Sequence, residues 1–189
     1  MTRKITQRII INILLWANLG VLLIAVGCAA KSAKMVPKCF DIVNKHPYIV
    51  SVNESTGGIE AKPLWVSQIS NYVFTKALND SLLKSGVFQG TITGGGVDSA
   101  GGADYILDVT ILDYDQPWHG ANIIINIETK WELTDARTHK SIWYNTFKTG
   151  YRAQWLESIF DGERIEKAQE SAAQANIMEG IRRLSLLSL

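Results

Sequence analysis

The chain has 189 residues, of which 47% are hydrophobic and 20% charged, and its formal net charge is +1. This length suits one compact domain, since domains usually hold roughly 100–200 residues. The apolar content is too high for a disordered chain, and the balanced charge excludes the strongly basic face of a nucleic-acid-binding protein. Two cysteines exclude a small domain held together by several disulfides.

The first 28 residues have the pattern of an export signal. Arg3, Lys4 and Arg8 precede an apolar run over residues 9–26 that contains two asparagines and no charge. A cationic start followed by an apolar stretch and small residues is typical of a secretory signal, whose cationic end stays in the cytoplasm. The run is longer than the usual signal core of roughly 7–15 residues. A retained membrane helix of about 20 residues therefore stays open as an alternative.

The end of this run, Ala-Val-Gly-Cys at 25–28, resembles the lipobox of bacterial lipoproteins, although alanine stands where leucine is more usual. In that family the chain is cut before the cysteine, here after Gly27, and the thiol, here of Cys28, carries a diacylglyceryl group. The resemblance implies a membrane anchor of acyl chains such as palmitate. Because Ala29 and Ala30 follow in place of aspartate, it further implies the periplasmic face of the outer membrane. The alternatives are an inner-membrane protein with one N-terminal helix and a cleaved product without lipid.

The rest of the chain divides into a spacer and one domain. We predict a signal peptide over residues 1–27, the lipidated cysteine and a tether over 28–39, and a single domain over 40–189. The small and polar residues before Pro37 are typical of a flexible spacer. Cys39 has no cysteine partner once Cys28 is lipidated, and we interpret it as a small buried residue beside Phe40. An intermolecular disulfide or a reactive thiol stays open as an alternative.

Hydrophobic periodicity predicts five strands and two helices in the order β-α-β-β-β-β-α. Strands are predicted over residues 47–54, 87–93, 104–114, 122–133 and 141–149. One helix is predicted from an N-cap at Ser67 to Lys84, before Gly86. Another is predicted from an N-cap at Asp161 to about Leu184. Clean alternation of apolar and polar residues, clearest over 122–133, is typical of an antiparallel sheet covered on one side. We expect an α+β fold of two layers, in which an antiparallel sheet of about four to five strands carries both helices on one face.

No set of residues has the pattern of a catalytic or metal-binding site. The histidines are far apart in the sequence, and we expect all three on the surface or in loops: His46, His119 and His139. Asp104 and Asp108 share one face of a strand, which we interpret as a solvated face and not as an acid/base pair. The glycine-rich residues 94–102 lack the Lys-Ser/Thr ending of a phosphate loop. The sequence predicts no enzyme, no metal, no cofactor and no nucleic-acid partner.

Three tryptophans of the predicted domain lie in or beside loops. Trp65, Trp118 and Trp155 either pack locally or act as contacts for a partner, since exposed aromatic residues dominate many interfaces. We take these three as candidate partner-binding residues. The C-terminal residues 185–189 (SLLSL) are either an apolar docking strip or the frayed end of the last helix.

Across residues 40–184 the chain resembles small periplasmic lipoproteins of the β-α-β-β-β-α type. The segments that carry the likeness are SLLKSGVF, ADYILDVTI and TDARTHKSIWYNTF. These lipoproteins include auxiliary components of ABC-type lipid transport and, more distantly, LPS-assembly lipoproteins. The resemblance implies a non-catalytic partner of a membrane transport or assembly complex, which we expect to bind through a sheet edge or the loop tryptophans. The alternative is a lipid-binding or lipid-shuttling module whose helix–sheet interior holds an acyl chain.

Overall fold

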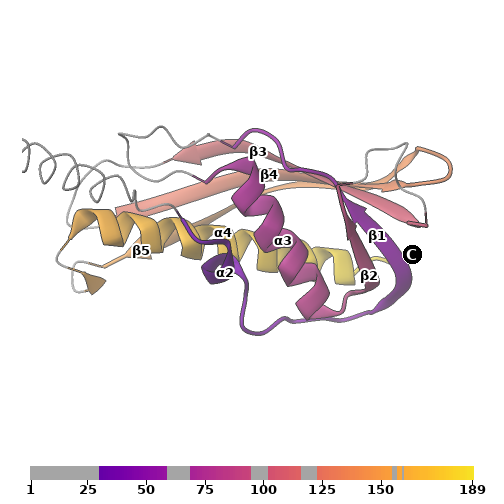
Figure 1. Cartoon of the computed structure of the whole chain (residues 1–189), viewed down its shortest axis with the longest axis horizontal. Coiled ribbons are helices and arrows are strands. Elements are labelled where there is room, and N and C mark those ends of the chain that lie inside the picture. The colour runs from indigo at the N-terminus through magenta and orange to yellow at the C-terminus, as the bar shows by residue number, and fades with distance from the viewer. Residues whose placement is uncertain (1–29, 59–68, 95–101, 116–122, 155–156, 159) are drawn as a thin grey trace, which may run out of the picture.

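A computed structural model describes residues 30–58, 69–94, 102–115, 123–154, 157–158 and 160–189. Figure 1 shows a sheet with helices on one of its faces. The strands are β1 (His46–Val52), β2 (Phe88–Thr93), β3 (Tyr105–Asp115), β4 (Ile123–Asp135) and β5 (Ser141–Ala153), in the spatial order β2-β1-β3-β4-β5. The helices are α2 (Ser32–Met35), α3 (Asn71–Ser85) and α4 (Asp161–Ser185). The predicted α+β class and the placement of both long helices on one face are confirmed.

The sheet is mixed, so the prediction of a wholly antiparallel sheet is wrong. β3–β4 and β4–β5 are antiparallel, but β1 runs parallel to both β2 and β3. The physical reason is that α3 connects β1 to β2 as a crossover, which returns the chain to the end of the sheet where β1 began. Alternation along a strand reports which face is buried and says nothing about the direction of the neighbouring strand.

Both long helices begin at other positions than predicted. The N-cap of α3 is Ser70, whose hydroxyl accepts the backbone N–H of Val73 at 3.3 Å, and the predicted cap Ser67 lies outside the described residues. In α4 the N-cap position is Phe160, and Asp161 is the first helical residue. An acidic side chain in the first turn still stabilises the helix through the helix dipole. At the other end of α3, Gly86 has the expected left-handed conformation, with φ 63°.

The core lies between the helices and the inner face of β3, β4 and β5. In β4 the inner side chains are buried without exception, and the intervening ones are partly or fully exposed. Trp131 is the largest fully buried side chain, and its indole packs directly against the backbone of α4 at Gly180. A side chain at that helix position would occupy the space of the indole, so the glycine sets how closely α4 approaches the sheet.

Two predicted environments are wrong. Cys39 is exposed with a free thiol, because the apolar residue of that segment that packs against the core is its neighbour Phe40. His46 is buried, with its Nε2 atom 3.0 Å from the carbonyl oxygen of Leu184, because β1 brings it under the end of α4. His139 is exposed in the β4–β5 turn, as predicted, and His119 lies outside the described residues.

Candidate functional site: the β5 edge and the N-terminal segment

β5 forms one margin of the sheet. It pairs with β4 from Ser141 to Ala153, and among the described residues no strand pairs with its other side, which we call the β5 edge. Backbone N–H and C=O groups on such an edge can accept a strand from another protein. A strand of 13 residues is long for an unpaired edge. The geometry therefore offers an extended template for strand addition.

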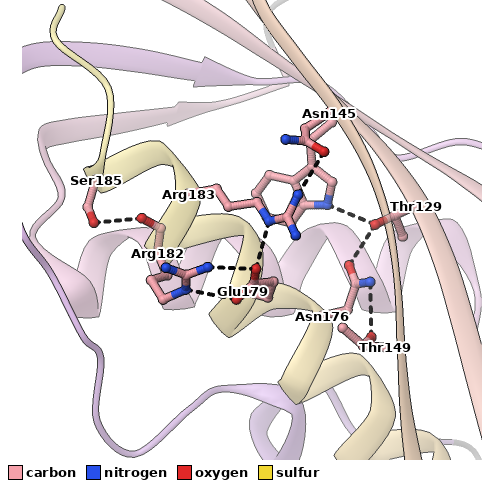
Figure 2. Close-up of polar contacts among 9 residues, drawn as sticks. Thr129, Asn145, Thr149, Asn176, Glu179, Arg182, Arg183 and Ser185 are labelled. Carbon is pink, nitrogen blue, oxygen red and sulfur yellow. Dashed lines mark hydrogen bonds and ion pairs between the residues drawn. The ribbon is translucent and has the colours of Figure 1, made fainter.

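A buried hydrogen-bond chain holds β5 and β4 to α4 (Figure 2). The indole N–H of Trp131 donates to the Thr129 hydroxyl at 3.0 Å, and this hydroxyl donates to the Asn176 carbonyl oxygen at 2.8 Å. The Asn176 amide then donates to the Thr149 hydroxyl of β5 at 3.1 Å. Thr129, Trp131 and Asn176 are fully buried. Because breaking any link would leave a buried polar group unpaired, this chain fixes the helix in one position over the two strands.

A second group of contacts holds the middle of β5 (Figure 2). The Arg183 guanidinium donates to the Asn145 side-chain oxygen at 2.7 Å. It also lies 4.5 Å from the centre of the Phe147 ring. Arg183 also pairs with Glu179, which accepts two further bonds from Arg182. The Arg182 hydrogen bond, followed by that of Arg183, lowers the pKa of Glu179 to about 2. These contacts hold the middle of β5 in one conformation, and a strand that is already ordered loses less conformational entropy if another strand pairs with it.

The outer face beside the β5 edge presents apolar and aromatic groups. Tyr144 is 71% exposed and Ile142 is 44% exposed. They line a shallow hollow of about 570 Å³ together with the ion pair of Lys130 and Glu132, whose charged atoms are 2.7 Å apart. Aromatic residues are enriched at protein interfaces, and a free strand edge can pair with a strand of another protein. The sequence signal for this site is the presence of Ile142 and Tyr144 at the start of a strand whose outer face is otherwise polar.

The N-terminal residues 30–36 contact α4, although we expected residues 28–39 to be a flexible spacer. The side chain of Met35 is fully buried. The Lys34 ammonium lies 3.3 Å from the Glu170 carboxylate, which also accepts the backbone N–H of Lys31 at 2.9 Å. The amide of Gln174 donates to the carbonyl oxygen of Val36 at 3.1 Å. One buried apolar side chain and several polar contacts thus attach this segment to the domain.

The predicted site residues all lie outside the described residues: Gly27, Cys28, Trp65, Trp118 and Trp155. Of the predicted carboxylates, Asp104 accepts the backbone N–H of Ile49 at 2.8 Å and Asp108 accepts the Asn53 amide at 2.8 Å. Both join β1 to β3. In the part of the chain that the structure describes, no three His, Cys, Asp or Glu side chains are placed to hold a metal ion.

Two further observations concern lipid. Of the helices that the structure describes, none has the length and apolar character needed to cross a membrane. Under the sheet, near Ile69 and Tyr114, the described side chains leave a cavity of about 10 Å³. By this measure a cavity needs about 10–15 Å³ to hold one water molecule, so this cavity is too small for an acyl chain.

No protein-family model and no curated protein sequence matches the chain. Protein XCC0632 from Xanthomonas campestris, of family DUF330, aligns with 80% of this chain and 90% of its own, with a TM-score of 0.56 and 11% identity. The PelC dodecamer from Paraburkholderia phytofirmans aligns with 78% of this chain and 94% of its own, with a TM-score of 0.51 and 14% identity. A minor lipoprotein from Acinetobacter baumannii covers 77% of this chain and 94% of its own, with a TM-score of 0.45 and 17% identity. The alignments with XCC0632 and PelC show a shared fold.

Proposed function

We propose that the protein is a lipid-anchored, non-catalytic component of the bacterial envelope that binds a protein of a transport or assembly complex through the β5 edge. The observation that carries this proposal is the edge itself, a strand of 13 residues held by α4 and bordered by the exposed Tyr144. Trp65, Trp118 and Trp155 are proposed as additional partner contacts. The shared fold with PelC, which is described as a dodecamer, supports a role in assemblies.

The proposed anchor is the thiol of Cys28 after cleavage behind Gly27, and the proposed location is the periplasmic face of the outer membrane. Several acyl chains on one cysteine bind a bilayer stably, since each buried methylene contributes about 0.8 kcal/mol. The described segment that follows, from Ala30 to Met35, is attached to α4. The lipid on Cys28 would then hold the domain directly at the membrane surface, without a long flexible linker between them.

The alternative of a lipid carrier is less well supported by the packing. An acyl chain held between helices and sheet would need the space that Trp131, Phe74 and Leu78 occupy, and all three are fully buried. Opening that space would also break the hydrogen-bond chain between Trp131 and Asn176. A protein-binding role uses surfaces that are already exposed.

A photo-cross-linking amino acid at Tyr144 in the full chain tests the β5 edge in cells. We expect adducts with an envelope protein from this position and none from Tyr72, a matched control on α3 that is 68% exposed. Ile142→Asp places a charge in the hollow beside Tyr144 and should weaken the adduct. Equal adducts from Tyr144 and Tyr72, or an adduct that Ile142→Asp leaves unchanged, would contradict the proposed surface.

Metabolic labelling with palmitate tests the anchor separately. The wild-type chain should incorporate label, and Cys28→Ser should not. Cys39→Ser is the matched control, because it removes the other thiol and should leave labelling intact. Label that persists in Cys28→Ser would show that this cysteine is not the lipidated residue.

A further inference from the structure

We infer that the N-terminal half of α4 is the face of the domain that lies on the lipid bilayer, with Phe160 inserted among the headgroups. This inference rests on the lipidation of Cys28 proposed above. Figure 1 shows the start of α4 at the end of the molecule opposite to the C-terminus and the β4–β5 turn. The C-terminus and the β4–β5 turn would accordingly point away from the membrane.

The path of the chain limits the distance between the anchor and α4. Ala30 is two residues from Cys28, and two residues span at most about 7 Å. From Ala30 onward the segment is attached, since the Lys31 N–H binds Glu170 at 2.9 Å and Met35 is fully buried. A membrane-inserted lipid on Cys28 therefore brings the surface around Glu170 to the headgroup region.

Phe160 extends this surface toward the start of the helix. Its backbone is fixed, because its N–H donates to the Ser158 hydroxyl at 3.1 Å and its carbonyl accepts the Arg164 N–H at 3.2 Å. Its side chain is nevertheless 69% exposed. It precedes Glu170 by ten residues, which corresponds to about 15 Å along a helix. An exposed aromatic ring held close to a lipid anchor is suited to the interfacial region of a bilayer.

The charges of this face indicate which lipid surface it fits. A groove of about 590 Å³ runs along α4 beside the attached N-terminal segment. It is lined by four cationic and four anionic side chains: Lys31, Lys34, Arg164, Lys167, Glu157, Glu163, Glu166 and Glu170. Several are paired, as Lys34 is with Glu170 at 3.3 Å and Lys167 with Glu157 at 2.5 Å. The groove carries no net charge, and Asp161 beside Phe160 adds one negative charge, so this face gains little from anionic lipid. It fits zwitterionic headgroups, with the apolar contact supplied by Phe160.

The test uses the full lipidated chain in vesicles of phosphatidylethanolamine and phosphatidylcholine, with Cys39→Ser to remove the free thiol. An environment-sensitive fluorophore is attached to Phe160→Cys or, as a control, to Tyr144→Cys, which is exposed to a similar degree. Spin-labelled lipid should remove most of the fluorescence at position 160 and leave position 144 unchanged. Raising the salt from about 0.1 M to about 1 M should not reverse the quenching, because the face has no excess of positive charge that salt could screen.

The outcomes separate this inference from the proposed anchor. Palmitate on the chain together with unquenched fluorophore at position 160 overturns the membrane face and leaves the anchor in place. Equal quenching at positions 160 and 144 shows that the domain has no fixed orientation, and also overturns it. A wild-type chain that carries no palmitate overturns the anchor and this inference with it.

Discussion

Replacement of Gly180 by alanine tests the close contact between α4 and the sheet. A Cβ atom at this position would lie 2.3 Å and 2.4 Å from two ring carbons of Trp131. Nonbonded carbon atoms normally stay about 3.5–4.0 Å apart. The methyl group and the indole would therefore overlap, and either the helix or the ring has to move.

One favourable and two unfavourable effects set the magnitude. Alanine is favoured over glycine in a helix by about 1 kcal/mol. Overpacking a dense core costs about 1–3 kcal/mol. The Trp131 ring is fully buried, and its N–H is bonded to Thr129, so a shift of the ring also weakens a buried hydrogen bond that contributes about 1 kcal/mol. We expect Gly180→Ala to lower the free energy of unfolding by about 2 kcal/mol, the difference between these effects.

Urea unfolding of the purified protein measures this change, and Gly162→Ala in the same helix is the matched control. A Cβ at Gly162 meets no atom within 4 Å. The control should be neutral or more stable than the wild type by up to about 1 kcal/mol. If Gly180→Ala is as stable as Gly162→Ala, α4 does not contact Trp131 as closely as described and the reasoning fails.

Three further substitutions test other contacts. Asn176→Ala removes the hydrogen bonds that Asn176 makes with the Thr129 and Thr149 hydroxyls and should cost about 2–3 kcal/mol in urea unfolding. A loss below about 0.5 kcal/mol, the size of an ordinary surface effect, would argue against the buried chain. Met35→Ala should cost about 2–5 kcal/mol and expose the N-terminal segment to protease, and an unchanged digestion pattern would show that this segment is not held by Met35. Glu179 has a folded pKa of about 2 against an ordinary value of 4.5, so its stabilising effect is complete above pH 4.5 and lost as the pH falls toward 2. Glu179→Gln should thus be less stable than the wild type by about 1–2 kcal/mol at neutral pH, and the two proteins should be equally stable near pH 2. A difference in stability that does not shrink on acidification contradicts the pairing of Glu179 with Arg182 and Arg183.

Several local features were predictable because they depend on neighbouring residues alone. The alternation in β4 predicts which side chains are buried, since successive side chains of a strand point to opposite faces. Gly86 ends α3 as expected, because a left-handed residue after a helix favours glycine. The predicted start of α3 at Ser67 shows the limit of such rules. Several serines lie near one another, and the contact that selects Ser70 exists only once the turn has formed.

Other features depend on contacts between distant parts of the chain. That Cys39 is exposed and His46 buried depends on which residues reach α4, and the polarity of a single residue does not report this. The attachment of Met35 likewise needs a hydrophobic surface that α3 and α4 create together. Small, polar segments resemble flexible spacers until such a surface is known.

The sequence by itself determined the five strands, the two long helices and the single helix-covered face, because these follow from the period at which apolar residues recur. It also supplied the candidate anchor at Cys28, which is a pattern of adjacent residues. Only the tertiary structure decided the parallel direction of β1, the position of β5 at the margin of the sheet and the contact between residues 30–36 and α4. These depend on which segments meet in space, and that choice is made by packing across the whole domain.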